Sequence, residues 1–192
     1  MTPRRLYAPV VLATLAVGGL AFFAAGRTWA RAEVKAEGLA AAKVAVSGAD
    51  AQPLVSALAI VVVTAALAVL AAGPRLRRVV GALTMVGATV GAISVPRSGG
   101  GTLDGAVRSA AEKSPAYTGP SSLGDISHSP WDLLTILAFV LAFVLGLVTL
   151  RLAAQWPTMS SRYERPSGRD VRDAPSDTDM WKALDQGDDP TT

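Results

Sequence analysis

The sequence has no cysteine and a single histidine, His128, among its 192 residues. Without cysteine the chain can form no disulfide bond, no thiolate nucleophile and no cysteine-ligated metal site. With one histidine it cannot hold a metal ion between two histidines of the same chain. We expect His128 to be a solvated loop residue.

Charged and aromatic residues are also scarce. Only 17% of the residues are charged and 6% are aromatic, whereas 51% are hydrophobic. A soluble domain averages about 25% charged residues. The charge is missing in blocks rather than evenly along the chain, which indicates segments that lie in lipid.

Four blocks are almost purely apolar: residues 6–26, 54–73, 79–95 and 131–150. An α-helix needs about 20 residues, within a range of about 17–25, to cross the hydrocarbon core. All four blocks are long enough, and none carries the polar face of a soluble core helix. The sequence therefore predicts an all-α polytopic membrane protein with four transmembrane helices.

This prediction divides the chain into a four-span membrane domain, residues 1–150, and a largely disordered tail, residues 151–192. Two loops, residues 27–53 and 96–130, then lie on the side of the membrane opposite the termini.

The first apolar block has a second interpretation. Arg4 and Arg5 precede it and Ala30-Arg31-Ala32 follows it, as in a signal peptide with its cleavage site. The block is longer than the apolar core of about 7–15 residues that is usual in such peptides. We favour an uncleaved helix, with cleavage as the alternative.

The basic residues predict the orientation. Arg75, Arg77 and Arg78 crowd the short turn between the second and third blocks, and Arg151 opens an arginine-rich tail. The basic residues of the two loops are diluted and interleaved with acids. By the positive-inside rule we expect a bacterial inner-membrane protein with both termini in the cytoplasm, and an arginine turn that fixes topology rather than binding nucleic acid.

Several residues near the ends of the blocks are suited to the interface between lipid and water, where Trp and Tyr are enriched and an Arg stem can lie along lipid. We assign to this interface Trp29, Trp131, Arg151, Trp156 and Tyr163.

The fourth block opens with a helix-start pattern. Ser129 is the expected N-cap and Pro130 the expected first helical residue. We interpret Asp132 as a capping carboxylate at the interface rather than a proton relay.

Both loops carry periodic patterns. Residues 30–37 alternate between small apolar and charged side chains, and residues 43–47 alternate again, so the first loop predicts a small extracytoplasmic antiparallel β-ribbon. In the second loop, the pattern between Thr102 as N-cap and Pro115 as terminator predicts a helix. Its apolar stripe consists of Leu103, Ala106, Val107, Ala110 and Ala111.

Gly87 and Gly91, beside Gly81, give the third block a small-xxx-small face that allows another helix to approach closely. We expect packing within one chain, with a homo-oligomer as the alternative.

The sequence carries no recognisable catalytic or ligand-binding motif. The sequence has no glycine-rich phosphate-binding loop, and no ionisable residue lies at the centre of an apolar block. We therefore expect no enzymatic activity, no cofactor and no metal.

The C-terminal end predicts a short helix near residues 177–186, with a capping box at its start. Met180, Trp181 and Leu184 would form one apolar face on it, flanked by aspartates that oppose binding to anionic lipid. We expect this face to dock on a cytosolic protein partner, with a disordered end as the alternative.

Three stretches, SGADAQPLVSALAIV, WPTMSSRYERP and DMWKALDQGDDPT, carry a resemblance to a known family. The chain resembles the actinobacterial family of tryptophan biosynthesis-associated membrane proteins. The resemblance implies a link to that pathway but supplies no catalytic or binding residues. Our leading hypothesis is a non-enzymatic accessory or interaction protein. The alternative is a small transporter or exporter of an aromatic metabolite, although the polar residues within the blocks are few.

Overall fold

The computed structural model describes residues 3–35, 41–97, 101–156 and 185. The chain divides into two units, residues 1–157 and 158–192, and of the second only Asp185 is described. Tyr163 and the predicted docking residues Met180, Trp181 and Leu184 therefore lie outside the described residues.

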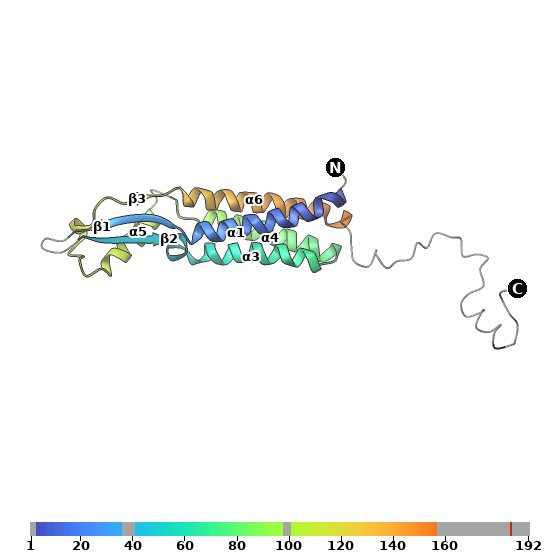
Figure 1. The fold of residues 1–192 in the computed structure, drawn as a ribbon, viewed down its shortest axis with the longest axis horizontal. Coiled ribbons are helices and arrows are strands. Elements are labelled where there is room, and N and C mark those ends of the chain that lie inside the picture. The colour runs from blue at the N-terminus through green and yellow to red at the C-terminus, as the bar shows by residue number, and fades with distance from the viewer. Residues whose placement is uncertain (1–2, 36–40, 98–100, 157–184, 186–192) are drawn as a thin grey trace. The chain divides into compact units, whose positions relative to one another are not determined.

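Four long helices form an antiparallel bundle (Figure 1). They are α1 (Tyr7–Ala25), α3 (Pro53–Ala71), α4 (Pro74–Ser94) and α6 (Trp131–Leu152), with short 3-10 turns at Pro3–Leu6 and Ala153–Gln155. Helix α1 packs against α3 and α6, and α4 packs against the same two helices. Each helix is long and apolar enough to cross a membrane, which confirms the prediction of four spans.

The bundle has small side chains inside and large apolar side chains outside. The buried positions of α1 include Thr14, Gly18 and Ala21. The exposed ones across the bundle include Leu12, 64% exposed, and Ile93, 78% exposed. This distribution is typical of membrane helices, where small residues allow the backbones to approach and lipid covers the large side chains.

Helix α4 starts earlier than the sequence predicted. It begins at Pro74, whose missing N–H suits the first helical position, so Arg75, Arg77 and Arg78 form its first turns. Only Ala72 and Gly73 connect it to α3. The predicted arginine turn is thus mostly helix.

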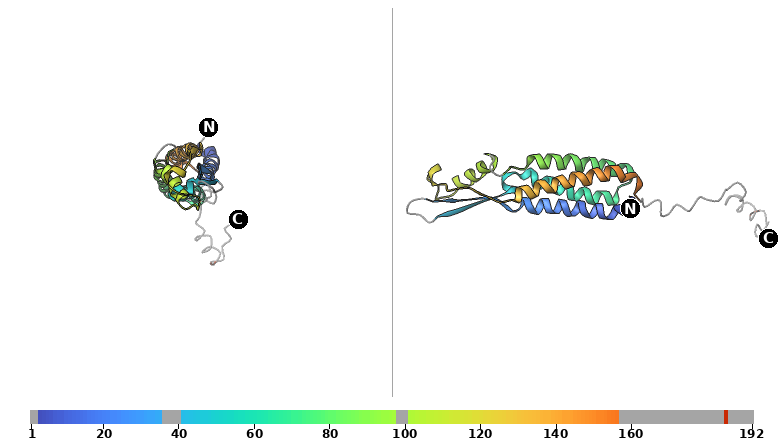
Figure 2. Two further views of the ribbon diagram at one scale, coloured as in Figure 1. Left: turned by 90° about the vertical axis from the view of Figure 1, so that its left-hand side faces the viewer. Right: turned by 90° about the horizontal axis from the view of Figure 1, so that it is seen from above.

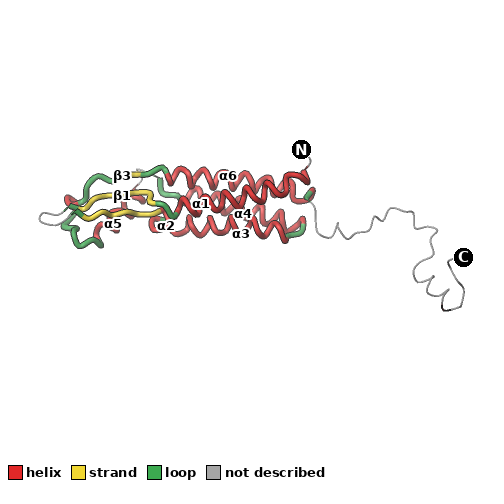
Figure 3. Tube along the Cα trace, in the orientation of Figure 1, coloured by secondary structure: helices red, strands yellow, loops and turns green. Residues whose placement is uncertain are grey.

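The two loops fold together at one end of the bundle into what we call the loop domain (Figure 3). Its elements are β1 (Thr28–Val34), β2 (Ala42–Ser47), α2 (Gly48–Ala51), α5 (Gly101–Glu112), a 3-10 turn (Pro120–Ser122) and β3 (Ser127–His128). The N-terminus and the end of α6 lie at the opposite end of the bundle (Figure 2).

The loop domain contains a three-stranded antiparallel sheet in the order β2-β1-β3. Strands β1 and β2 confirm the predicted ribbon, with Ala32 opposite Val44 and Glu33 opposite Lys43. Strand β3, which the sequence did not predict, pairs Ala30 with His128. His128 is exposed, as predicted, but it lies in this edge strand rather than in a loop.

Helix α5 follows the predicted periodicity and covers the sheet. Leu103, Val107 and Ala111 are fully buried, four residues apart on one helix face. The helix includes Gly101, so Thr102 lies within the first turn and is not the predicted N-cap. The apolar core continues from this helix into the bundle, so the loop domain and the spans are packed as one body.

The junction between β3 and α6 differs from the predicted helix start. The N-cap is Pro130, and the Ser129 hydroxyl instead donates a hydrogen bond to the Thr28 carbonyl at 2.6 Å. Ser129 thereby ties the second loop to the first. Asp132 lies in the first turn of α6 as expected, but it is 1% exposed and so is inside the protein rather than at the lipid interface.

Candidate functional site

Trp29 connects the bundle to the loop domain. Its indole N–H donates to the Ala24 carbonyl at 2.9 Å, and the same carbonyl accepts the Arg27 N–H at 3.1 Å at the C-terminal end of α1. A Cβ on Gly48 would collide with the indole ring, so α2 packs directly on it. Trp29 is 0% exposed, which corrects its predicted place at the lipid interface: the ring is a core residue.

The other aromatic residues at this end remain at the surface. Trp131 is half-buried and lies edge-on to Phe23, with 6.1 Å between ring centroids. The Arg27 guanidinium lies 4.1 Å from the Phe23 ring centroid, a cation–π contact. Trp131 is thus placed where its predicted interfacial role is feasible.

At the opposite end, Arg77 is buried among aromatic rings. It is 3% exposed, and its Nε donates to the Val69 carbonyl at 3.1 Å. The guanidinium also lies 4.8 Å from the Tyr7 ring centroid, and Trp156 meets Tyr7 edge-on at 5.3 Å. Arg77 therefore fastens α4 to α3 and α1, and Trp156, buried in this cluster, is not at the predicted lipid surface.

The remaining basic residues of this end are free to meet lipid or solvent. Arg75, Arg78 and Arg151 are exposed. Their predicted roles in topology and at the interface stay predictions.

Gly81 of α4 faces the backbone of α6 closely, and of the predicted glycine pair only Gly91 has a tight neighbour. A Cβ on Gly81 would lie 2.9 Å from the Leu150 nitrogen and 3.0 Å from the Gly146 oxygen. Gly91 faces the Phe139 ring just as tightly, whereas a Cβ on Gly87 would have ordinary room, 3.9 Å from Leu58. The packing is within the chain, between α4 and α6.

The interior of the bundle is nearly solid. Its hollow, lined in part by Thr14, Thr84 and Thr149, measures about 10 Å³, which is about the space of one water molecule. Each of these three hydroxyls donates to the carbonyl four residues earlier in its own helix. The hydroxyl protons of these three threonines are thus used within their own helices.

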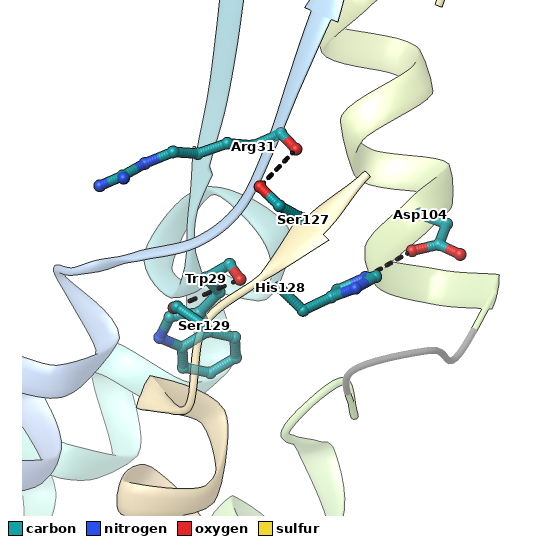
Figure 4. A network of polar contacts seen from close by, with 6 residues as sticks. All are labelled: Trp29, Arg31, Asp104, Ser127, His128 and Ser129. Atoms are coloured by element: carbon teal, nitrogen blue, oxygen red, sulfur yellow. Dashed lines mark hydrogen bonds and ion pairs between the residues drawn. The ribbon is translucent and has the colours of Figure 1, made fainter. Parts of the chain in front are cut away.

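The loop domain carries a much larger hollow of about 660 Å³, between α5 and the segment from Tyr117 to His128. Asp104, Arg108 and Glu112 line it from α5. The imidazole Nε2 of His128 lies 2.9 Å from the Asp104 carboxylate, across 24 residues of sequence (Figure 4). Asp125 lines the hollow as well, so acidic, basic and imidazole side chains meet around it.

Residues 11–191 match the family model of the tryptophan-associated transmembrane proteins. The chain belongs to this family. The match confirms the resemblance carried by the sequence, apart from the actinobacterial source, on which it has no bearing. No curated protein and no solved structure matches this tryptophan-associated transmembrane protein.

Sequence reasoning missed most of the site in this tryptophan-associated transmembrane protein. The Asp104–His128 contact depends on β3, a strand of two residues that is too short to show a period. The one available signal was the spacing of Asp104, Arg108 and Glu112, which places three charges on one face beside the apolar stripe of the predicted helix.

Proposed function

We propose that this tryptophan-associated transmembrane protein is a non-enzymatic accessory protein in which the four helices anchor the loop domain outside the cytoplasmic membrane. The observation that carries the proposal is the contrast between the two hollows. The hollow between the helices, beside Thr14, Thr84 and Thr149, measures about 10 Å³, whereas the loop domain forms a hollow of about 660 Å³. Ligand sites are usually hollows of about 300–1,000 Å³, so the loop domain is the part built to bind.

The orientation is supported by exposed arginines at the end of the bundle opposite the loop domain. Arg75 and Arg78 lie in the first turns of α4 and Arg151 lies in the last turn of α6, and basic residues favour the cytoplasmic side. The loop domain is then extracytoplasmic. The C-terminal segment with Trp181 is cytosolic in this arrangement, and we propose that it docks on a cytosolic protein linked to tryptophan biosynthesis.

A transporter is the competing function, and the packed interior argues against it. Transporters usually bind their substrate near the middle of the bilayer through broken helices and polar groups. Here the three interior threonines bond to their own helices, and the Gly81–Gly146 contact closes the space between α4 and α6.

Two measurements on the intact protein test the proposal. Affinity purification in mild detergent should recover a cytosolic partner, and the purified protein in liposomes should carry no aromatic metabolite across the bilayer. Specific, saturable uptake into these liposomes would replace the accessory function with transport.

A further inference from the structure

The hollow of the loop domain has one charged wall. Asp104, Arg108 and Glu112 succeed one another at intervals of four residues along α5, so their side chains lie in one row. This row is next to the buried stripe that holds α5 on the sheet. The packing of α5 therefore fixes where the charges stand.

The charges of this wall are not all paired with one another. Asp104 is paired with His128, with 2.9 Å between the imidazole Nε2 and the carboxylate oxygen. Among the described residues, Arg108 and Glu112 form no ion pair, nor does Asp125, which lines the hollow from the facing segment. One guanidinium and two carboxylates are thus available in the same hollow.

The facing segment adds apolar groups to the hollow beside Asp125 and His128. They are the half-buried side chains of Tyr117, Leu123 and Ile126, together with Pro120. Apolar groups beside a few charged groups are a usual lining of a small-molecule site.

We propose that this hollow binds a small zwitterion with an apolar side chain, of which an α-amino acid is the simplest form. The Arg108 guanidinium matches a carboxylate, because its planar fork can donate two parallel hydrogen bonds. Glu112 and Asp125 provide acceptors for an ammonium group. Tyr117 and Leu123 contact the side chain of the ligand.

The charges that line the hollow favour a zwitterion over three other classes of ligand, which are dianions, organic cations and metal ions. A dianion would meet two unpaired carboxylates beside a single guanidinium. A simple organic cation would leave Arg108 without a partner. A metal ion is not favoured, because the described residues contain no group of three His, Asp or Glu side chains placed to hold one.

This inference rests on the proposed function, since it assigns a ligand to the loop domain that the bundle anchors. The two can fail separately. Liposome uptake and partner recovery test the accessory function, whereas the binding experiment below uses purified full-length protein and depends on neither.

The experiment is isothermal titration calorimetry of the full-length protein in mild detergent with L-tryptophan and L-leucine. Two analogues remove one charge each: tryptamine lacks the carboxylate and indole-3-propionate lacks the ammonium group. We expect saturable binding of at least one amino acid and an affinity at least about tenfold lower for both analogues, equal to about 1.4 kcal/mol.

The variant Arg108→Gln tests the assignment of the guanidinium. It should lower the affinity for the amino acid at least about tenfold and leave the weak binding of tryptamine unchanged, because tryptamine has no carboxylate to lose. Lys113→Gln removes a neighbouring exposed positive charge that does not line the hollow, and it should leave binding intact. Thermal unfolding of each variant shows that it is folded.

Three outcomes would overturn the proposal. They are the absence of heat with both amino acids at millimolar concentration, equal affinities for amino acids and analogues, and equal losses in Arg108→Gln and Lys113→Gln. The first would show that the hollow is not a site for zwitterions. The other two would show that binding does not depend on the two charges that the wall offers.

Discussion

The contact between α4 and α6 at Gly81 predicts how alanine substitutions at three glycines change the stability of the protein. A methyl group at Gly81 would lie 2.9 Å from the Leu150 nitrogen, and backbone atoms cannot turn aside as a side chain can. The two helices would have to separate by about 0.5 Å, a gap that forfeits about a quarter to a half of the dispersion energy of the contacts it opens.

Gly87→Ala and Gly19→Ala are matched controls in the same bundle. A Cβ on Gly87 meets Leu58 at 3.9 Å, and a Cβ on Gly19 meets nothing within 4 Å. We expect Gly81→Ala to lower the free energy of unfolding by about 1–3 kcal/mol, the usual range for overpacking. Both controls should be neutral or gain up to about 1 kcal/mol, because Ala favours helix over Gly.

The assay is thermal unfolding of the purified proteins in the same detergent, monitored by circular dichroism. A chain of this size changes its Tm by about 2–4 °C for each kcal/mol, so the variants should separate clearly. Equal Tm values for all three variants would refute the close approach of α4 and α6 at Gly81.

Three further predictions concern other parts of the chain. Trp29→Phe removes one of the two hydrogen bonds to the Ala24 carbonyl and should destabilise the protein by about 0.5–1.5 kcal/mol, measured by the same unfolding assay. Arg77→Gln should lower Tm because its guanidinium is buried and bonded, whereas Arg75→Gln, at an exposed position, should leave Tm unchanged within a degree or so. Trp181→Ala should leave insertion intact and lower the affinity for the partner by roughly 30- to 1000-fold, so affinity purification should recover less of the partner. Identical recovery with the wild-type protein and the variant would reject the docking face.

Patterns repeated over many residues were predictable from the sequence. The four helices follow from long apolar blocks, and strands β1 and β2 follow from an alternation that keeps Ala32 buried and Arg31 exposed. The stripe of α5 was predictable for the same reason, since Leu103 and Val107 repeat with the helical period.

Contacts between distant residues were not predictable. An aromatic residue that follows an apolar block looks the same whether it meets lipid or protein, and Trp29 is buried because Gly48, distant in the sequence, packs on its ring. The small-xxx-small pattern likewise shows that a helix can be approached but not where. It indicated Gly87 and Gly91, of which only Gly91 has a tight neighbour, while the close approach to the backbone of α6 is at Gly81.

The absence of cysteine allows a direct test of the central claim. The claim is that the loop domain is extracytoplasmic and that the start of α1 and the end of α6 are on the cytoplasmic side. Ser109→Cys places a single thiol on the exposed side of α5, and Gln155→Cys places one at the other end of the bundle. With a maleimide that cannot cross membranes, intact cells should label Ser109→Cys, and Gln155→Cys should react only after permeabilisation. Labelling of Gln155→Cys and protection of Ser109→Cys in intact cells would contradict the account.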